Sequence, residues 1–547
     1  MKCAIIDTTD YLRERGTDMK EFNTTAVCIP SKHYMVDITD KVQAIRKLVD
    51  AGKYFTINRA RQYGKTTTLT ALDHALAADY DVISLDYQDM TDAAYATESG
   101  FVKALALMLC DARDTMGASV PDHAYEALQA LSSADKDLLL SDLFRVIDKW
   151  CRENEKPLVL IIDEIDSATN TQAFLDFLGK LRSNYIKREK NPNFRTFQSV
   201  ILAGVTDIKH LKAKIRPDEI VKQNSPWNIA ADFNVDMSLS EPGIRGMLDA
   251  YENDHHTGMD TADMAKQIHD YTSGYPFLVS RICQLIDTVV CENMAPAEAW
   301  SRTGLDEAIK LILAEKNTLF QSLTKNLNNA PELKEMLRSI LMEGLRLPYV
   351  SQSNETELLE MYGLIKNDHN AIKVSNRIFE TMLYNLFISE EKLQNSVFYN
   401  TSSLEKNRFV QDGKLNMRLI LERFIATYTE VLGPLENKFK EKDGRELFLL
   451  YLKPIINGTG NYYIEAQTRD MTRTDIIVDY LGQRYIIELK IWRGERYNAE
   501  GEQQLREYLD YFQLDMGYML SFNFNKNKRQ GVEQVQVGDK LLIEAML

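Results

Sequence analysis

Several features that would mark a specialised class of protein are scarce in this sequence. Its 547 residues include only six cysteines, and no two of them form a C-x-x-C pair. That scatter argues against a zinc site and a disulfide framework, and it fits a reducing compartment. The apolar runs, such as PLVLII, fall far short of the roughly 18 residues of a membrane-spanning helix, and the start MKCAIIDTTDYLRERG becomes polar too early for a signal peptide. We therefore expect a cytoplasmic protein without a membrane partner.

Positive charge is also in deficit. The 65 lysines and arginines are outnumbered by 80 acidic residues, which gives a formal net charge of −15 at pH 7. This balance argues against a protein that coats nucleic acid without specificity. A local basic groove stays compatible with it, because phosphate binding responds to the local field. The hydrophobic share of 44% is ordinary for a globular protein, and the length predicts about three domains.

A phosphate-binding loop lacks its usual first glycine. In INRARQYGKTTTL, the second half of the Walker A pattern G-x-x-x-x-G-K-[ST] is satisfied by Gly64, Lys65 and Thr66, but Arg59 stands at the first glycine's position. A strand-like run precedes the loop and a leucine pattern of helical spacing follows it, as a P-loop requires. Lys65 is expected to reach the β- and γ-phosphates of ATP, and Thr66 to offer its hydroxyl to Mg²⁺. Arg59 and Arg61 either add charge near the phosphates or face solvent.

A second motif supports the nucleotide site. The buried-strand run LVLIID ends in Asp163 and is followed by Glu164, which is the Walker B arrangement. At the edge of the sheet Asp163 can hold Mg²⁺ directly or through water, and Glu164 can orient and deprotonate an attacking water. The backbone N–H groups at the start of the helix after the loop, that of Thr67 included, would bind the phosphates. We therefore predict ATP binding and hydrolysis.

Apolar strand-like runs alternate with helices in the first part of the chain, at KYFTINRA, DVISLDY, PLVLIIDE and SVILAGVT. Such a pattern predicts an α/β fold with a parallel sheet covered on both faces, over residues 22–240. Residues 241–326 are almost wholly helical, apart from TSGYPF, and are interpreted as a helical lid. Residues 331–395 predict two helices, two strands around an Asn-Asp-His-Asn turn and a further helix, which is typical of a winged-helix-like module. Such a module either reads DNA or acts as a spacer.

The sequence resembles a known family at YMVDI, YFTINRARQYGKTTTL, LIIDEID and SPWNIA, namely the AAA-ATPase-like proteins of anaerobic bacteria, whose Walker A motif commonly starts with arginine. The resemblance covers about residues 22–235 and implies a P-loop ATPase of the additional-strand class, with a further strand between Walker A and Walker B. It also implies a polar sensor at the tip of the next strand, at Thr206 or Asp207. SGYPFLVSRI resembles the lid helix of related signal-transduction ATPases, which makes Arg281 a candidate second sensor.

A β-hairpin is predicted near the other end of the chain. TDIIVDYLGQRYIIELK alternates with a period of two residues and turns at Leu481 and Gly482. If the turn is centred between these residues, Asp479 lies opposite Arg484, and the two form a favourable cross-strand ion pair.

Two acids and a lysine are predicted to meet on one face of this hairpin. The same pairing places Asp475 opposite Glu488, and Lys490, two residues further on, points to the same face. Neighbouring carboxylates repel, and a divalent cation with a preference for oxygen ligands, Mg²⁺ or Mn²⁺, relieves the repulsion. A metal there would activate a water while Lys490 positions or activates the nucleophile, which is the chemistry of phosphodiester hydrolysis. The alternative is a solvated strand face with ordinary ion pairs.

The region of about 420–530 resembles the PD-(D/E)xK nuclease superfamily, and in particular the nuclease domain commonly joined to AAA-ATPase-like domains. The matching residues are Asp475, Glu488 and Lys490 of the motif, Glu446 of the first helix, and Gln504 and Tyr508 of a Q-x-x-x-Y helix. The resemblance implies that Glu446 is an accessory acid at the metal site and that Thr474 replaces the usual proline. It also implies a helix, a three-stranded meander, a helix and a last strand. Residues 416–547 are therefore expected to form a mixed α/β domain like that of restriction endonucleases.

Together the two sites predict an ATP-gated, metal-dependent nuclease, with a role in defence or mobile-element control suggested by analogy alone. DNA is favoured over RNA as its partner, but the sequence leaves the choice between them open. The alternative is a nucleotide-dependent switch or scaffold whose nuclease-like domain binds nucleic acid without cleaving it. Backbone contacts could come from Arg493, Arg496 and the run NKNKRQ, or from the basic run at residues 182–195. Whether the chain is a monomer or a homo-oligomer stays open.

Overall fold

The computed structural model describes residues 19–168, 171–191, 193–205, 227–341, 345–390, 398, 401–402, 408–411, 413–432, 441–456, 460–463, 476–492, 494–523, 525 and 530–547. The chain falls into two compact units. The first runs to Met247 and includes two short later stretches, Tyr275–Phe277 and Met361–Gly363. The second comprises Leu248–Gly274, Leu278–Glu360 and Leu364–Leu547.

The first unit is built on a parallel sheet. Its strands among the described residues are β1 (Phe55–Asn58), β2 (Asp81–Asp86), β3 (Leu158–Asp163) and β4 (Ser199–Gly204), in the order β1-β4-β3-β2. Every residue of β3 and β4 is buried, as expected of parallel strands covered on both faces. The predicted parallel sheet is confirmed. So is the implied further strand, because β4 separates the strand before the phosphate loop from the Walker B strand.

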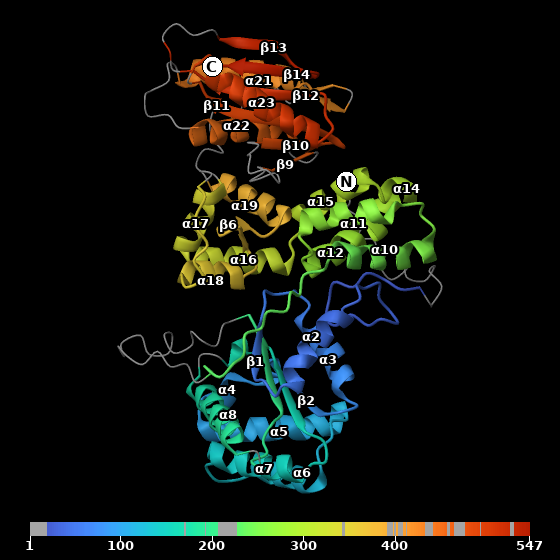
Figure 1. Ribbon diagram of the computed structural model, residues 1–547, viewed down its shortest axis with the longest axis vertical. Helices are drawn as coiled ribbons and strands as arrows, with labels where there is room; N and C mark the ends of the chain where they lie inside the picture. Colours follow the sequence, from blue (N-terminus) through green and yellow to red (C-terminus); the bar gives the residue numbers. More distant parts are fainter. Residues whose placement is uncertain are drawn as a thin grey trace, which may run out of the picture. The chain divides into compact units, whose positions relative to one another are not determined.

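Helices cover both faces of this sheet (Figure 1). They are α2 (Thr39–Asp50), α3 (Lys65–Leu76), α4 (Asp92–Tyr95), α5 (Glu98–Met116), α6 (Asp122–Ser132), α7 (Leu140–Glu153) and α8 (Gln172–Lys190). Alternate strand residues divide between two cores: Val159 and Ile161 pack with α2 and α3, whereas Leu160 and Ile162 pack with α5 to α8. The chain returns to the edge of β1 at Ala231, whose N–H donates to the carbonyl of Tyr54 (2.8 Å).

A helical region follows the first sheet. Its helices are α10 (Glu241–His255), α11 (Thr261–Thr272), α12 (Pro276–Leu285), α13 (Cys291–Asn293), α14 (Pro296–Ala299), α15 (Arg302–Ala314) and α16 (Thr318–Asn329), with a π-helical turn at Ile286–Val290. Next come α17 (Pro331–Leu341), α18 (Asn354–Met361), β5 (Ile365–Asp368), β6 (Ala371–Val374) and α19 (Arg377–Glu390). The predicted order of two helices, two strands and a helix is confirmed, and His369 and Asn370 turn between the strands with positive φ.

The C-terminal part of the second unit contains a mixed sheet. Its strands are β9 (Gly460–Tyr463), β10 (Ile476–Tyr480), β11 (Gln483–Ile491), β12 (Met516–Phe522), β13 (Gly531–Val537) and β14 (Lys540–Met546), in the order β13-β14-β12-β11-β10-β9. The accompanying elements are β7 (Val410–Gln411), β8 (Lys414–Leu415), α21 (Met417–Leu432), α22 (Glu441–Ile456) and α23 (Glu495–Tyr511). Helix α23 lies against this sheet (Figure 1). Its Leu505 and Leu509 share one apolar core with residues of the strands. The strand expected after the helix is present as β12, and a hairpin of β13 and β14, which was not predicted, follows it.

The predicted hairpin register is confirmed for the described residues. Asp479 pairs with Arg484, their side chains form an ion pair (Oδ1 to Nε, 3.2 Å), and Leu481 and Gly482 turn with φ of 46° and 76°. Two consecutive residues with positive φ form the turn type that matches the twist of a two-residue hairpin.

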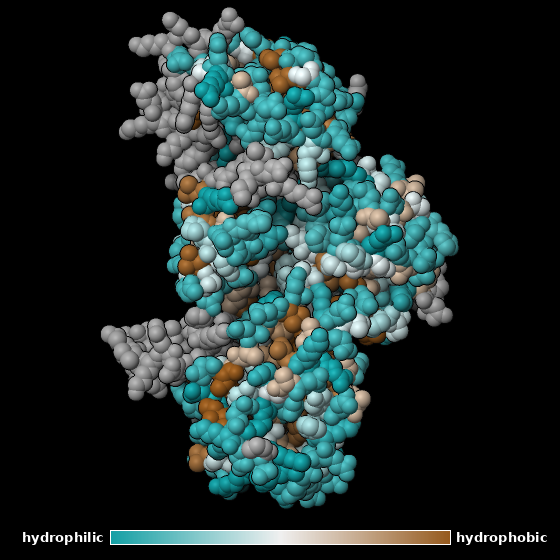
Figure 2. Space-filling model, viewed as in Figure 1, coloured by the Kyte–Doolittle hydropathy of each residue, from teal (hydrophilic) through white to brown (hydrophobic). Residues whose placement is uncertain are grey.

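The surface visible in Figure 2 is mostly hydrophilic, with apolar residues in small groups. Among the residues described, no helix combines the length and the apolar character that crossing a bilayer requires.

Candidate functional site

The phosphate loop leads directly into α3. Gly64 caps this helix with φ of 78°, a conformation that glycine adopts without strain. Lys65 is only 6% exposed, and its Nζ donates to the carbonyls of Arg59 (3.1 Å) and Ala60 (3.2 Å). Burial lowers the pKa of Lys65, while the negative charge of Glu164 opposes that shift. The lysine is therefore held within the loop, where a phosphate group can replace the two carbonyls as its partner.

A hydroxyl and a carboxylate meet beside the loop. Thr66 Oγ1 donates to Oδ2 of Asp163 at 2.9 Å, which brings the Walker A and Walker B residues together. Two oxygen donors in this arrangement fit Mg²⁺. Glu164 follows with φ of 51°, and its N–H donates to Oδ1 of Asp163 (2.9 Å). Burial raises the pKa of Glu164, which favours its use as a proton acceptor from water.

Arg59 has a placement that the sequence did not suggest. One guanidinium nitrogen donates to the carbonyl of Asn58 (2.8 Å) and another to that of Val235 (3.0 Å), and the group lies over the ring of Phe233 at 5.3 Å. Arg59 thus holds the chain at residues 233–235, and a contribution of its charge near the phosphates stays a prediction. The side chain of Arg61 is exposed.

Three further contacts at this site were not predicted from the sequence. Asp86, the last residue of β2, pairs with Asp163, and the pKa of Asp86 is raised by burial and further by the Asp163 charge. Asp166 accepts the N–H of Val205 at 2.8 Å. Thr67, predicted to bind phosphate through its backbone, also accepts the N–H of Cys28 through its hydroxyl (3.1 Å). For Asp86 the available signal was an apolar strand that ends in an acid, as in the Walker B strand.

The two candidate sensors have different outcomes. Thr206 and Asp207 lie outside the described residues. Arg281, in the second unit, donates from Nη2 and Nε to Oε2 of Glu315 (2.6 and 3.1 Å) and from Nη1 to Oε1 of Gln284 (2.5 Å). Each nitrogen of its guanidinium therefore has a partner within the helical region, and a sensor role stays a prediction.

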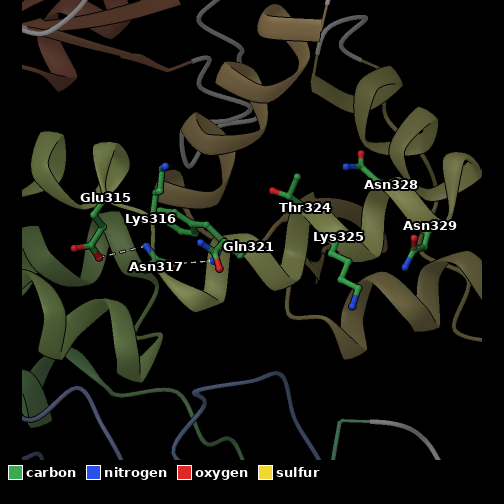
Figure 3. A pocket seen from close by; sticks show the side chains of 9 residues that line it. Glu315, Lys316, Asn317, Gln321, Thr324, Lys325, Asn328 and Asn329 are labelled. Carbon is green, nitrogen blue, oxygen red and sulfur yellow. Dashed lines mark hydrogen bonds between the residues drawn. The ribbon is translucent and has the colours of Figure 1, made fainter.

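Glu315 also borders an open pocket of about 610 Å³, most of whose lining residues are of polar type (Figure 3). All lining residues come from residues 315–329, so the pocket follows one side of α16. Asn317 donates to Glu315 at 3.3 Å and caps α16 by accepting the N–H of Phe320. The side chain of Asn317 thus supplies a hydrogen-bond acceptor to a backbone N–H group at the start of α16.

The second predicted site lies between β11 and α23. Glu488 is 1% exposed, and its Oε1 is 2.9 Å from Nζ of Lys490. Lys490 Nζ also donates to Oε1 of Gln504 at 3.2 Å. A Cβ on Gly501 would lie 3.3 Å from Cε of Lys490, so a glycine lets α23 approach this face closely. Asp475, by contrast, lies outside the described residues.

The other residues named for this site lie on the helices beside the sheet. Tyr508 of α23 is 1% exposed, and Glu446 of α22 is half-buried. Among the described residues no group of three or more His, Cys, Asp or Glu side chains could hold a metal ion, and the predicted set of Glu446, Asp475 and Glu488 extends beyond those residues.

A further carboxyl group that was not predicted, that of Glu544, lies on the same face of the sheet as Glu488. Glu488 pairs with Met519, which pairs in turn with Glu544, so the two glutamates share one row of the sheet. Asn498 of α23 donates to Glu544 (3.3 Å) and to Glu502 (2.8 Å). Burial raises the pKa of Glu544 to about 7, and the charge of Glu502 adds to that shift.

A glycine-capped phosphate loop, a hydroxyl–carboxylate pair and a parallel sheet with an inserted strand together define a P-loop ATPase. Residues 22–385 match the AAA-like domain family, and the chain belongs to that family. The protein is accordingly an ATP-binding and ATP-hydrolysing AAA-like ATPase. No curated protein matches it.

Among solved structures, the chain is similar to a Walker-type ATPase of Pyrococcus abyssi, at 14% identity over 66% of this chain and 99% of that one, with a TM-score of 0.46. It is also similar to Cdc6p from Pyrobaculum aerophilum, at 13% identity over 67% and 97%, with a TM-score of 0.34. The RuvB Holliday junction branch migration motor of Thermotoga maritima has 12% identity over 62% and 92%, with a TM-score of 0.31.

Proposed function

We propose that this ATPase uses ATP to control a metal-dependent nuclease in its C-terminal region, with DNA as the substrate. In this proposal residues 22–240 form the ATPase, 241–326 its helical lid, 331–395 a winged-helix-like module and 416–547 a restriction-endonuclease-like domain. The observation that carries the proposal is the buried Glu488 carboxylate beside Lys490, which is itself held by Gln504.

Buried charge is the reason to assign chemistry to this face. A carboxylate at 1% exposure is costly unless charges or hydrogen bonds compensate it, and such arrangements are frequent at functional sites. Lys490 compensates one negative charge. The hairpin register, continued by one residue, would bring Asp475 opposite Glu488 and add a second negative charge. Glu488, Asp475 and Glu446 would then hold Mg²⁺ or Mn²⁺, which when bound supplies an activated water.

The ATPase half of the proposal rests on the loop and the Walker B strand. Thr66 and Asp163 would hold Mg²⁺, which when bound neutralises phosphate charge. Lys65 would exchange its two carbonyl partners for phosphate oxygens. Glu164, whose pKa is raised by burial, would take a proton from the attacking water.

We place the contacts with DNA in the C-terminal region, for which the charges of two other segments give some support. Helix α18 of the winged-helix-like module carries Glu355, Glu357 and Glu360, which repel phosphates. In the basic run at residues 182–195, the Arg188 guanidinium is occupied by backbone carbonyls and by the ring of Tyr185. Arg496, whose side chain is 96% exposed at the start of α23, is a candidate for contacts with the DNA backbone.

The test is cleavage of labelled duplex and single-stranded DNA by the full chain with Mg²⁺ or Mn²⁺, compared between wild type, Lys490→Ala and Lys540→Ala. Lys540 is a matched control, because it is a buried lysine of the same sheet that pairs with an acid, Asp510 (3.1 Å). We expect cleavage by wild type and Lys540→Ala and none by Lys490→Ala. Equal cleavage by all three proteins would exclude the face around Lys490 as the site of DNA cleavage. No metal-dependent cleavage by wild type, with DNA binding retained, would support the alternative of a switch that binds DNA without cutting it.

A further inference from the structure

The first half of the phosphate loop has no glycine, and its conformation needs support from elsewhere. Residues 59–62 are Arg-Ala-Arg-Gln, and Gln62 adopts φ of 56°, which is costly for a residue with a side chain. The carbonyls of Arg59 and Ala60 hold Lys65, so the path of this segment decides where the lysine lies. Contacts outside the loop must therefore stabilise that path.

Tyr275 supplies one such contact. This residue belongs to the TSGYPF segment between α11 and α12, and its hydroxyl donates to the carbonyl of Arg61 at 2.5 Å. Its ring meets the ring of Tyr63 edge to face, with centroids 4.7 Å apart. Tyr275 is 2% exposed, so the hydrogen bond is shielded from water. Pro276, the next residue, lies against Gly64: a Cβ on Gly64 would be 3.8 Å from the proline Cγ.

Gly363 contacts both the loop and Tyr275. It has φ of 73°, and a Cβ there would lie 2.9 Å from Cβ of Ala60 and 3.4 Å from Cε2 of Tyr275. A side chain at this position would displace one of them. The stretches around Tyr275 and Gly363 are the two short segments that belong to the first unit although their neighbours in sequence belong to the second.

We propose that Tyr275, supported by Gly363, is a positioning residue for ATP binding. Tyr275 fixes the peptide of Arg61 and the ring of Tyr63, and thereby holds the loop in the path that a standard Walker A motif obtains from its first glycine. The residue touches the loop backbone rather than the chemistry. Its loss therefore weakens nucleotide binding and leaves the hydrolysis step of bound ATP unchanged.

The first test compares Tyr275→Phe with Tyr54→Phe in the full chain. Tyr54 is the matched control, because it is a fully buried tyrosine of the same unit whose hydroxyl also donates to a carbonyl, that of Phe197 (3.1 Å). We expect Tyr275→Phe to raise the Kd for a fluorescent ATP analogue and the KM for ATP about five- to tenfold, as loss of one shielded hydrogen bond does, with kcat within about twofold. Tyr54→Phe should lower thermal stability without changing Kd. An unchanged Kd in Tyr275→Phe, the same rise in Tyr54→Phe, or a fall in kcat at constant KM would overturn the proposal.

The second test compares Gly363→Ala with Gly117→Ala. Gly117 has nearly the same φ, 70°, but a Cβ there would meet no atom within 4 Å, so it reports the backbone strain alone. We expect weaker ATP binding in Gly363→Ala and unchanged binding in Gly117→Ala. Equal ATP affinity in the two variants would refute the part assigned to Gly363, and the Tyr275→Phe comparison, which adds no atoms, would still decide the role of Tyr275.

Discussion

Restoring the consensus glycine at the start of the phosphate loop should harm this protein. Arg59 stands where Walker A motifs have glycine, and its guanidinium donates to the carbonyls of Asn58 and Val235 and lies over Phe233. The substitution Arg59→Gly removes all three interactions. It also gives the loop additional freedom in the unfolded state, because glycine loses more conformational entropy on folding than other residues.

The size of the effect follows from these contacts. Hydrogen bonds from a charged donor contribute about 1.5–3 kcal/mol each when buried, and a cation–π contact about 0.5–1 kcal/mol. Arg59 is half-buried, so the low end applies. Since one of the two hydrogen bonds joins adjacent residues, we expect the unfolding free energy of the first unit to fall by about 2–4 kcal/mol in Arg59→Gly.

The assay is urea unfolding of the full chain followed by tryptophan fluorescence, together with titration of a fluorescent ATP analogue. Arg59→Lys serves as the control, because lysine keeps the charge but loses the planar fork, and it should be destabilised by a smaller amount. ATP should not bind more tightly to Arg59→Gly. A variant with stability within about 0.5 kcal/mol of wild type, or with tighter ATP binding, would show that the anchor at residues 233–235 is unimportant.

Two further predictions concern the buried charges between α15 and the C-terminal sheet, both in the second unit. Asp479 accepts hydrogen bonds from Tyr271 (3.0 Å), Arg302 (3.2 Å) and Arg484 (3.2 Å). The substitution Asp479→Asn should therefore lower the unfolding free energy by about 2–3 kcal/mol, which is less than for a fully buried pair because Arg302 is partly exposed. An unchanged free energy in urea unfolding would count against this network. Burial raises the pKa of Asp306 to about 6, with the Asp479 charge adding to the shift. Its unfolded pKa is near 3.9, so the folded state binds the proton more tightly, and this stabilisation is complete below about pH 4 and lost as the pH rises through 6. Asp306→Asn should therefore gain about 1–3 kcal/mol relative to wild type between pH 4 and 6.5 in unfolding measurements, and a difference independent of pH would contradict the assignment.

Much of the fold was accessible from the sequence, because local patterns determine it. The strands of the first sheet are short apolar runs between helices, and each was located at or near its observed bounds. The register of the C-terminal hairpin followed from the turn at Leu481 and Gly482, because a two-residue turn fixes every pair on both strands. The final hairpin was missed. None of the residues Gly531–Val537 is buried, and the adjacent Glu533 and Gln534 break the alternation of apolar and polar residues by which strands are identified.

The site was predictable only in part. Lys65, Thr66 and Asp163 were identified because the motif itself specifies their roles, and the structure brings the last two within hydrogen-bonding distance. The partners of Arg59 and the contact of Tyr275 with Arg61 could not be inferred. These pairs are far apart in the sequence, 176 residues for Arg59 and Val235 and 214 for Tyr275 and Arg61, and no periodicity links them.

The contacts of basic residues could not be predicted from the sequence either. Arg188 stands in a run of charges that suggested a nucleic-acid surface, yet it donates to the carbonyls of Phe197 and Gln198 and lies over Tyr185. A guanidinium has five donors in a planar fork, so it can tie together several backbone segments as readily as it binds phosphate. Only the fold distinguishes the two uses.

The coupling of the two sites is tested most directly by single-turnover cleavage of end-labelled DNA with and without ATP, in wild type and in Lys65→Ala. Lys65 is confined to the phosphate loop by its bonds to Arg59 and Ala60, so its replacement affects the nucleotide site without touching Glu488 or Lys490. We predict that ATP changes the cleavage rate of wild type by about five- to 150-fold, the range of ordinary coupling energies, and leaves that of Lys65→Ala unchanged. Cleavage by wild type that is indifferent to ATP, or an equal response in Lys65→Ala, would contradict the account.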